Sequence, residues 1–254
     1  MTPTFAGTIE RRLLVNYRAD PERVASELPA GFEPQLVGPY AIVGICLIQL
    51  RIHIDGLPRF TGFRSRNGAH RISVIDPGGR PAVYIRRRDT GSPLVAHLGG
   101  RVFPAHHHRA KLDIAEHGDR IDITLDSRDH AQHVDVRTTR AKVLPTDSAF
   151  ADVQHASNFF RDATIGYAPN VRGDRLDAVE LHAANWAVTP MRIDHVESSY
   201  FDDPHRFPAG TIEPDHALLM RNVDHTWHVR PPRALDLAAA RHGRESSDRQ
   251  PATC

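Results

Sequence analysis

Three consecutive histidines stand near the middle of the 254-residue chain, at positions 106–108. His106 and His108 are two residues apart, so on a strand their side chains point to the same face. The pattern that follows puts Ala110 and Leu112 on that face, which is the apolar one. Imidazoles that face an apolar interior can transfer protons or anchor a carboxylate, and we predict such a catalytic role for His106 and His108. The alternative is a pair of partly exposed histidines at the start of a strand.

The same pair does not by itself predict a metal centre. A metal site needs a third protein ligand, and no His-x-x-x-His spacing or His-x-His-plus-acid signature accompanies His106 and His108. We therefore predict no metal ligand set and no cofactor, and metal analysis of the purified protein would test this.

A second polar group lies on the strand that begins at Pro81. Tyr84, Arg86 and Arg88 alternate along it and should share one face. A tyrosine and two arginines on one wall suit the binding of a carboxylate or phosphate, and we predict all three as substrate-binding residues. The alternative is a solvent-facing strand of an antiparallel sheet, in which Asp89 pairs with one of the arginines.

Glu197 begins a late cluster of acids and hydroxyls that includes Ser198 and Ser199. We predict that Glu197 faces the strand of His106 and adds a carboxylate to the catalytic group. A Ser–His–acid triad is not predicted, because the chain has no Gly-x-Ser-x-Gly elbow.

The chain has two lysines, Lys111 and Lys142, which are the candidates for amine catalysis. Lys111 has the opposite strand parity to the neighbouring apolar residues and lies beside Asp113. We predict that it is a solvated charge on the outer face of the sheet.

The elements that must position these residues are mostly strands. A short helix should be capped by Asp20, another should lie within 92–98, and a longer one should follow Asp147 and end by Gly166. These features predict an α+β protein: a single-domain, mostly antiparallel β-barrel or cone with a few flanking helices. The branched and aromatic patterns predict strands at 12–17, 41–52, 71–75 and 81–86, three in a meander over 109–143, two within 178–201, and one at 216–223.

We expect one domain over residues 1–230 and a disordered tail over 231–254, which is rich in Ser, Arg, Asp and Gln. The formal net charge of +1 gives no electrostatic basis for contact with nucleic acid or an acidic membrane. The longest apolar stretch, 39–50, is too short to span a bilayer, and the N-terminus has no apolar signal core. The two cysteines do not predict a disulfide. We expect a cytoplasmic protein.

Several segments resemble the acetoacetate decarboxylase-like superfamily. Residues 13–21 and 28–33 resemble its opening, in which a strand, an Asp-started helix and a Pro-x-Gly/Pro-Leu/Phe-Glu exit recur. Residues 100–104, Gly-Arg-Val-Phe-Pro, resemble its Gly-Arg-Glu…Phe/Tyr-Pro segment. The order of expected elements over residues 8–228 is similar to the YqjF-like branch, so the resemblance implies an acetoacetate decarboxylase-like barrel or cone.

The resemblance implies a site near these residues without the chemistry of the decarboxylases. Those enzymes follow Phe/Tyr-Pro with two lysines, one of which forms a Schiff base with the substrate ketone. Ala105 and His106 stand at those positions here, and neither can form an imine. The family's glutamate becomes Val102, and the arginine of its N-terminal Arg-Glu-Tyr becomes Glu10. We count Arg12, close to that position, among the predicted substrate-binding residues.

We therefore expect a small-molecule-binding barrel that acts as an enzyme on a keto- or carboxylate-bearing organic substrate. The chemistry would be His/Arg acid–base catalysis, lyase-like but without a Schiff-base lysine. The alternative is a non-catalytic ligand-binding or sensor protein on the same fold. The expected partner is the small molecule itself, with no nucleic acid and no membrane, and a homodimer is expected from the frequency of such dimers.

Overall fold

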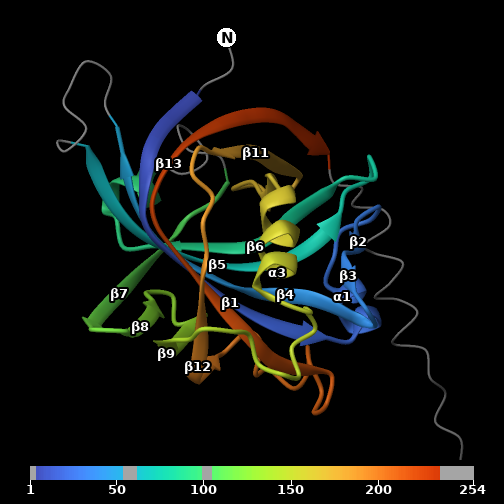
Figure 1. The fold of residues 1–254 in the computed structure, drawn as a ribbon. Coiled ribbons are helices and arrows are strands. Elements are labelled where there is room, and N and C mark those ends of the chain that lie inside the picture. The colour runs from blue at the N-terminus through green and yellow to red at the C-terminus, as the bar shows by residue number, and fades with distance from the viewer. Residues whose placement is uncertain (1–3, 54–61, 99–104, 235–254) are drawn as a thin grey trace, which may run out of the picture.

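The computed structural model describes residues 4–53, 62–98 and 105–234 (Figure 1). The bounds of its elements are β1 (Thr4–Ala19), α1 (Pro21–Ser26), β2 (Glu33–Pro34), β3 (Leu36–Val37), β4 (Tyr40–Ile52), β5 (Phe63–Ile75), β6 (Pro81–Thr90), α2 (Pro93–Leu98), β7 (His108–His117), β8 (Arg120–Ser127), β9 (His133–Arg140), α3 (Val153–Asp162), β10 (Ile165–Pro169), β11 (Arg175–Ala183), β12 (Thr189–Ser198) and β13 (Ile212–Ala234).

Every region predicted as strand contains a strand, but several strands are longer than the sequence patterns suggested. β13 continues to Ala234 because it pairs first with β1 and then, through its polar second half, with β11. Residues 231–234 therefore end a strand, and their assignment to a disordered tail was wrong. The rest of the predicted tail lies outside the described residues, as does the 100–104 segment.

α1 begins where its predicted capping residue placed it, whereas α3 begins at Val153, later than the start predicted after Asp147. The Asp20 carboxylate accepts hydrogen bonds from the backbone N–H groups of Glu22 and Arg23 at the start of α1. Asp152 caps α3 in the same way, through the N–H of His155. The longer helix is shorter than predicted, since β10 already begins at Ile165. None of the helices in the described ranges is long and apolar enough to cross a membrane.

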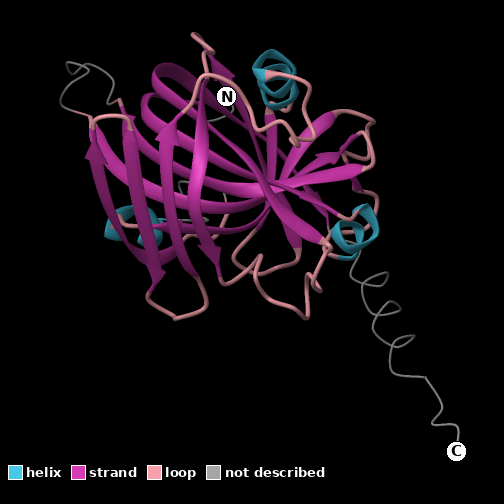
Figure 2. Ribbon diagram, turned by 60° about the horizontal axis from the view of Figure 1, so that its bottom comes forward, coloured by secondary structure: helices cyan, strands magenta, loops and turns pink. Residues whose placement is uncertain are grey.

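The strands form a ring-like but uneven sheet in which the pairings close two circuits. The strands β6, β5, β4, β1 and β13 are common to both circuits. β10 and β11 complete a smaller circuit, and β7, β8, β9 and β12 complete a larger one. Neighbouring strands are antiparallel except where β6 meets β10 and β7. Figure 2 shows strongly curved strands at the centre of the molecule and the helices at its periphery.

Strand alternation gives the shared strands two different faces. On β1, Leu13 and Val15 point into the main hydrophobic core, which takes side chains from every strand of the larger circuit. Leu14 points the other way, into a second cluster with Cys46 and with Phe160 of α3. The second face of the shared strands is therefore the one that α3 covers, and the candidate site lies there.

Candidate functional site

A cavity of about 360 Å³ lies on this second face. All seven strands of the smaller circuit contribute to its wall, together with α2, α3 and the segment before β7. Its volume is in the range of small-molecule sites in proteins. Most of the wall is apolar, with Phe5, Ile48, Leu50, Val83, Ile85, Val179, Leu181, Trp186 and Trp227 among the lining residues.

Four arginines line this apolar cavity: the exposed Arg161 of α3, and Arg12 of β1, Arg71 of β5 and Arg88 of β6. The Nε atoms of the three strand arginines are buried and have no hydrogen-bond partner. Burial lowers the pKa of Arg71 and of Arg88 to about 10, so both groups remain charged at neutral pH. Over the described residues no carboxylate forms an ion pair with any of the three, and the cavity wall contains no Asp or Glu. The described part of the cavity wall is therefore positively charged and holds no carboxylate.

Arg88 reaches the cavity because the alternation of β6 changes within the strand. In the pairing of β5 with β6, His70 is opposite Arg87 and Arg71 is opposite Ile85, so Arg86 is an extra residue. Such a bulge shifts the side-chain parity of the residues that follow it. Arg88 consequently shares a face with Ile85 in the cavity wall, although simple alternation would put them on opposite faces.

Arg71 is held by a chain of buried polar groups. Its Nη2 donates to Oδ1 of Asn16, and Nδ2 of Asn16 lies 3.0 Å from Nε2 of His216. His216 Nδ1 hydrogen-bonds to the Asp215 carboxylate, and both residues are buried. The guanidinium also lies over the ring of Phe160, 4.6 Å from its centroid. Arg71 is therefore held in place by its hydrogen bond to Asn16 and by its contact with Phe160 of α3.

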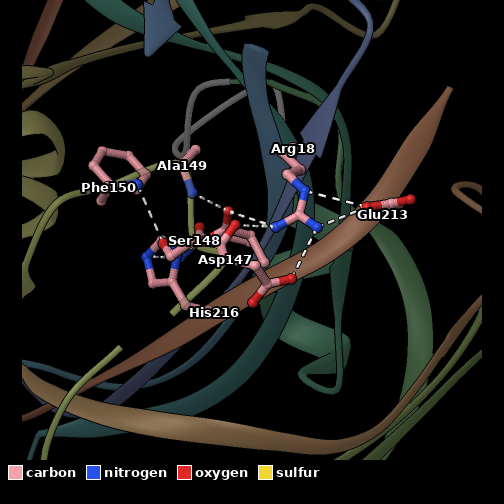
Figure 3. A network of polar contacts seen from close by, with 9 residues as sticks. Arg18, Asp147, Ser148, Ala149, Phe150, Glu213 and His216 are labelled. Atoms are coloured by element: carbon pink, nitrogen blue, oxygen red, sulfur yellow. Dashed lines mark hydrogen bonds and ion pairs between the residues drawn. The ribbon is translucent and has the colours of Figure 1, made fainter. Parts of the chain in front are cut away.

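The loop before α3 is tied to the same network (Figure 3). Ser148 Oγ donates to Asp215 over 2.6 Å, and the N–H of Ala149 donates to the same carboxylate over 2.7 Å. Burial opposes ionisation of Asp215, but its hydrogen bonds to His216, Ser148 and Ala149 lower its pKa overall. Arg18 fastens the loop from outside, donating to Asp147 and to Glu213 on β13 (Figure 3).

His107 is the histidine of the central run that lines the cavity. Its Nδ1 lies 3.2 Å from the carbonyl oxygen of Ala105, so the Nδ1–H tautomer donates there and leaves Nε2 as an acceptor. Burial, followed by the nearby charge of Arg88, lowers the pKa of His107 to about 3. The imidazole is therefore neutral in the unliganded protein at neutral pH.

The predicted pair His106 and His108 lies at the surface. His106 is exposed and His108 is partly exposed, with their ring centroids 4.2 Å apart and His108 Nδ1 3.3 Å from Asp129. β7 begins at His108, and Ala105 has a left-handed backbone (φ 70°), so strand alternation does not extend to His106. The expectation that His106 faces the interior was wrong. The acid–base role of the pair stays a prediction, which its surface position does not support.

The other predicted residues divide between the cavity and elsewhere. Arg12 and Arg88 line the cavity, whereas Tyr84 is buried in the main core with Phe32. Arg86 points away and forms an ion pair of 3.2 Å with Glu27.

Glu197 is exposed on β12, which pairs with β9 and β13 rather than with β7. The prediction that it faces the strand of His106 was therefore wrong, because this strand order could not be read from the sequence.

Neither lysine lies in the cavity wall. Lys111 is exposed and pairs with Asp113, as predicted, and Lys142 is also exposed. In the described part of the chain, no three His, Cys, Asp or Glu side chains are grouped so that they could hold a metal ion.

The sequence patterns missed Arg71 and His107. Arg71 opens a strand in which polar and apolar residues alternate, and such a pattern is normally typical of a solvent-facing surface. For His107 strand alternation gave no usable signal, because this residue precedes the start of β7 at His108.

The architecture is that of acetoacetate decarboxylase-like proteins. An acetoacetate decarboxylase-like enzyme from Sphingomonas wittichii RW1 matches with a TM-score of 0.60 at 11% identity, over 93% of this chain and 94% of that one. MppR, an enduracididine biosynthesis enzyme complexed with the condensation product of pyruvate and imidazole 4-carboxaldehyde, matches with a TM-score of 0.58 at 14% identity, over 92% and 90%. Acetoacetate decarboxylase from Legionella pneumophila matches with a TM-score of 0.56 at 12% identity, over 92% and 88%. At these identities the likeness concerns the fold.

The chain belongs to the family DUF2071, described as an uncharacterized conserved protein, whose profile matches residues 7–224. No curated protein sequence matches it significantly. The resemblance to the YqjF-like branch of the acetoacetate decarboxylase-like superfamily is thereby confirmed.

Proposed function

We propose that the cavity binds a small organic acid bearing a carboxylate and a keto group, within a barrel or cone of the acetoacetate decarboxylase type. The observation that carries this is the placement of Arg12, Arg71 and Arg88 in an apolar wall without a carboxylate among the described lining residues. A buried charge without a partner is unfavourable, and an anionic ligand removes that cost. Arginine binds carboxylates well because its planar fork of N–H donors matches the two carboxylate oxygens.

We further propose that the protein is an enzyme that uses His/Arg acid–base chemistry without a Schiff base. A carboxylate bound at Arg88 offsets the charge that now lowers the pKa of His107, so binding makes the imidazole a stronger base. Nε2 of His107 then takes a proton from the carbon next to the substrate carbonyl. The guanidinium groups stabilise the negative charge that develops on the carbonyl oxygen. His107 thus takes the role that the sequence predicted for His106 and His108.

The alternative is a non-catalytic binding or sensor protein, and one observation favours it. The wall formed by the described residues holds neither a lysine nor a carboxylate, so the two histidines His107 and His182 are its candidate acid–base groups. Binding and catalysis are separable experimentally, because the arginines would hold the ligand in both cases and His107 would matter for turnover in one.

Thermal shift and calorimetric titration with pyruvate and acetoacetate test the binding proposal, with pyruvamide as the uncharged control. We expect the acids to stabilise the wild type, the amide to have no effect, and Arg88→Met to abolish the response. Proton NMR in D₂O then tests catalysis: the wild type should exchange the protons next to the keto group, and His107→Gln should bind without exchange. Failure of every keto acid to bind at millimolar concentration would refute the proposal.

A further inference from the structure

The cavity is elongated along β4. Cys46, Ile48, Leu50 and Ile52 all line it, so one face of this strand forms its wall over six residue steps. At a rise of about 3.3 Å per residue, this stretch of strand is roughly 20 Å long. A three- or four-carbon keto acid contacts only a part of such a wall.

The two ends of this wall differ in chemistry. At one end Cys46 is buried, and the cross-strand row Cys46–Ala69–Arg88 leads directly to a cavity arginine. Arg71 enters from the adjacent row, where Gly44 is its partner on β4. This end of the cavity is therefore the buried, cationic one.

The other end is aromatic and half-buried. Phe5 of β1 and Leu181 of β11 both pair with Trp227 of β13, and all three line the cavity. Trp186 lies at the same cavity, and its indole N–H donates to Ser157 of α3 over 3.0 Å. That bond satisfies the polar atom of the indole and holds Trp186 against α3.

We propose that the ligand is an elongated apolar carboxylic acid. Its carboxylate binds Arg71 and Arg88, and its apolar body lies along β4 toward Trp227. Such a ligand neutralises the buried cations and covers the aromatic end, which a short acid leaves in contact with water. This inference rests on the carboxylate site of the proposed function and adds the shape of the ligand.

Tryptophan fluorescence can report whether a ligand occupies the cavity. Its two tryptophans both line the cavity, so intrinsic fluorescence is specific for this site. Titration with butanoate, octanoate and decanoate measures the effect of length at constant charge. Each buried methylene should strengthen binding roughly threefold to fourfold. We expect decanoate to bind at least about tenfold more tightly than butanoate, even with partial burial of the chain.

Two variants test the binding of the ligand's carboxylate and of its apolar chain separately. Leu181→Gln should weaken decanoate binding about tenfold and leave butanoate unchanged, with the exposed Val143→Gln as the matched control. Arg88→Met should weaken both acids. Circular dichroism and the melting temperature of each variant establish that it is folded before it is titrated.

Three other results of these titrations would contradict the inference. Equal affinity for butanoate and decanoate overturns it and leaves the carboxylate site of the proposed function standing. Decanol binding as tightly as decanoate overturns the placement of the carboxylate at the arginines. If neither acid binds to the folded wild type while pyruvate or acetoacetate does, the inference fails and the proposed function stands; if none of these acids binds, both fail.

Discussion

Arg71 of β5 donates a hydrogen bond to the side-chain oxygen of Asn16 on β1, where both residues are buried. The donors then run in one direction, from Asn16 to His216 and from His216 to the carboxylate of Asp215. A positive charge facing the cavity is thus connected through Asn16 and His216 to a buried carboxylate. The carboxylate helps to hold Arg71 in place and leaves the cavity side of the guanidinium available to a ligand.

Removing the middle of this chain should affect both stability and binding. Asn16→Leu removes the partner of Arg71 Nη2 and of His216 Nε2, and we expect a loss of about 2 kcal/mol in the free energy of unfolding. Carboxylate affinity should fall as well, because Arg71 is no longer positioned. Urea unfolding and ligand titration measure the two effects, with the exposed Gln154→Leu as control. A variant as stable as the wild type would contradict the arrangement.

Replacing Arg88 should have opposite effects on stability and function. Its guanidinium is buried in an apolar wall and has no ion-pair partner among the described residues, so Arg88→Met should raise the stability of the unliganded protein by about 1 kcal/mol. The same variant should lose carboxylate binding. Differential scanning calorimetry checks the first effect, and the exposed Arg137→Met should change stability by less than about 0.5 kcal/mol. Destabilisation by Arg88→Met would show that the group is compensated in the unliganded state.

Adjacent histidines should differ in their effect on the proposed chemistry. His107 lines the cavity and His106 is exposed, so His107→Gln should lower proton exchange on a bound keto acid by about 10²-fold or more. His106→Gln should behave as wild type in the same NMR assay. The reverse result would support the role predicted from strand parity, and equal activity of both variants would exclude His107 as the base.

Stability should fall on mild acidification because of buried neutral histidines. Burial lowers the pKa of His70 to about 3, against about 6.5 in the unfolded chain. Below about pH 6.5 the unfolded state binds a proton that the folded state does not, so stability is full above this pH and is lost progressively toward pH 3. The slope for this residue is about 1 kcal/mol per pH unit.

Urea unfolding between pH 7 and pH 4 measures this slope. His70→Phe keeps an aromatic ring among Tyr200 and Phe201 and should reduce the pH dependence. The exposed His205→Gln should leave it unchanged. An unaltered slope in His70→Phe would mean that other groups cause the acid sensitivity.

Borohydride should trap no covalent adduct with acetoacetate or pyruvate. Lys111 is exposed and paired with Asp113, and Lys142 is exposed, so neither amine lies at the cavity. Intact-protein mass spectrometry after reduction should therefore show only the unmodified mass. A stoichiometric adduct on either lysine would restore a Schiff-base mechanism.

Strand alternation predicted the site only in part. It identified Arg88 as a candidate, and the family resemblance identified Arg12; both lie in the cavity wall. It failed for Arg86, because a bulge at this residue changes the parity of β6, and for His106, because the strand begins two residues later. Bulges and strand starts depend on the partner strand, so a local pattern cannot place them.

Much about this protein is determined by the sequence alone. Residue types and spacing dictate the strands, the capped start of α1, and the lack of a lysine pair after the Phe-Pro motif, since these features depend on neighbours within a few residues. The tertiary structure decided which strand face is enclosed and which arginines line the same cavity. Two closed circuits of strands share β1, β4, β5, β6 and β13, so both faces of these strands are covered and polar residues on one of them become a cavity wall. Such long-range closure leaves no local signal in the chain.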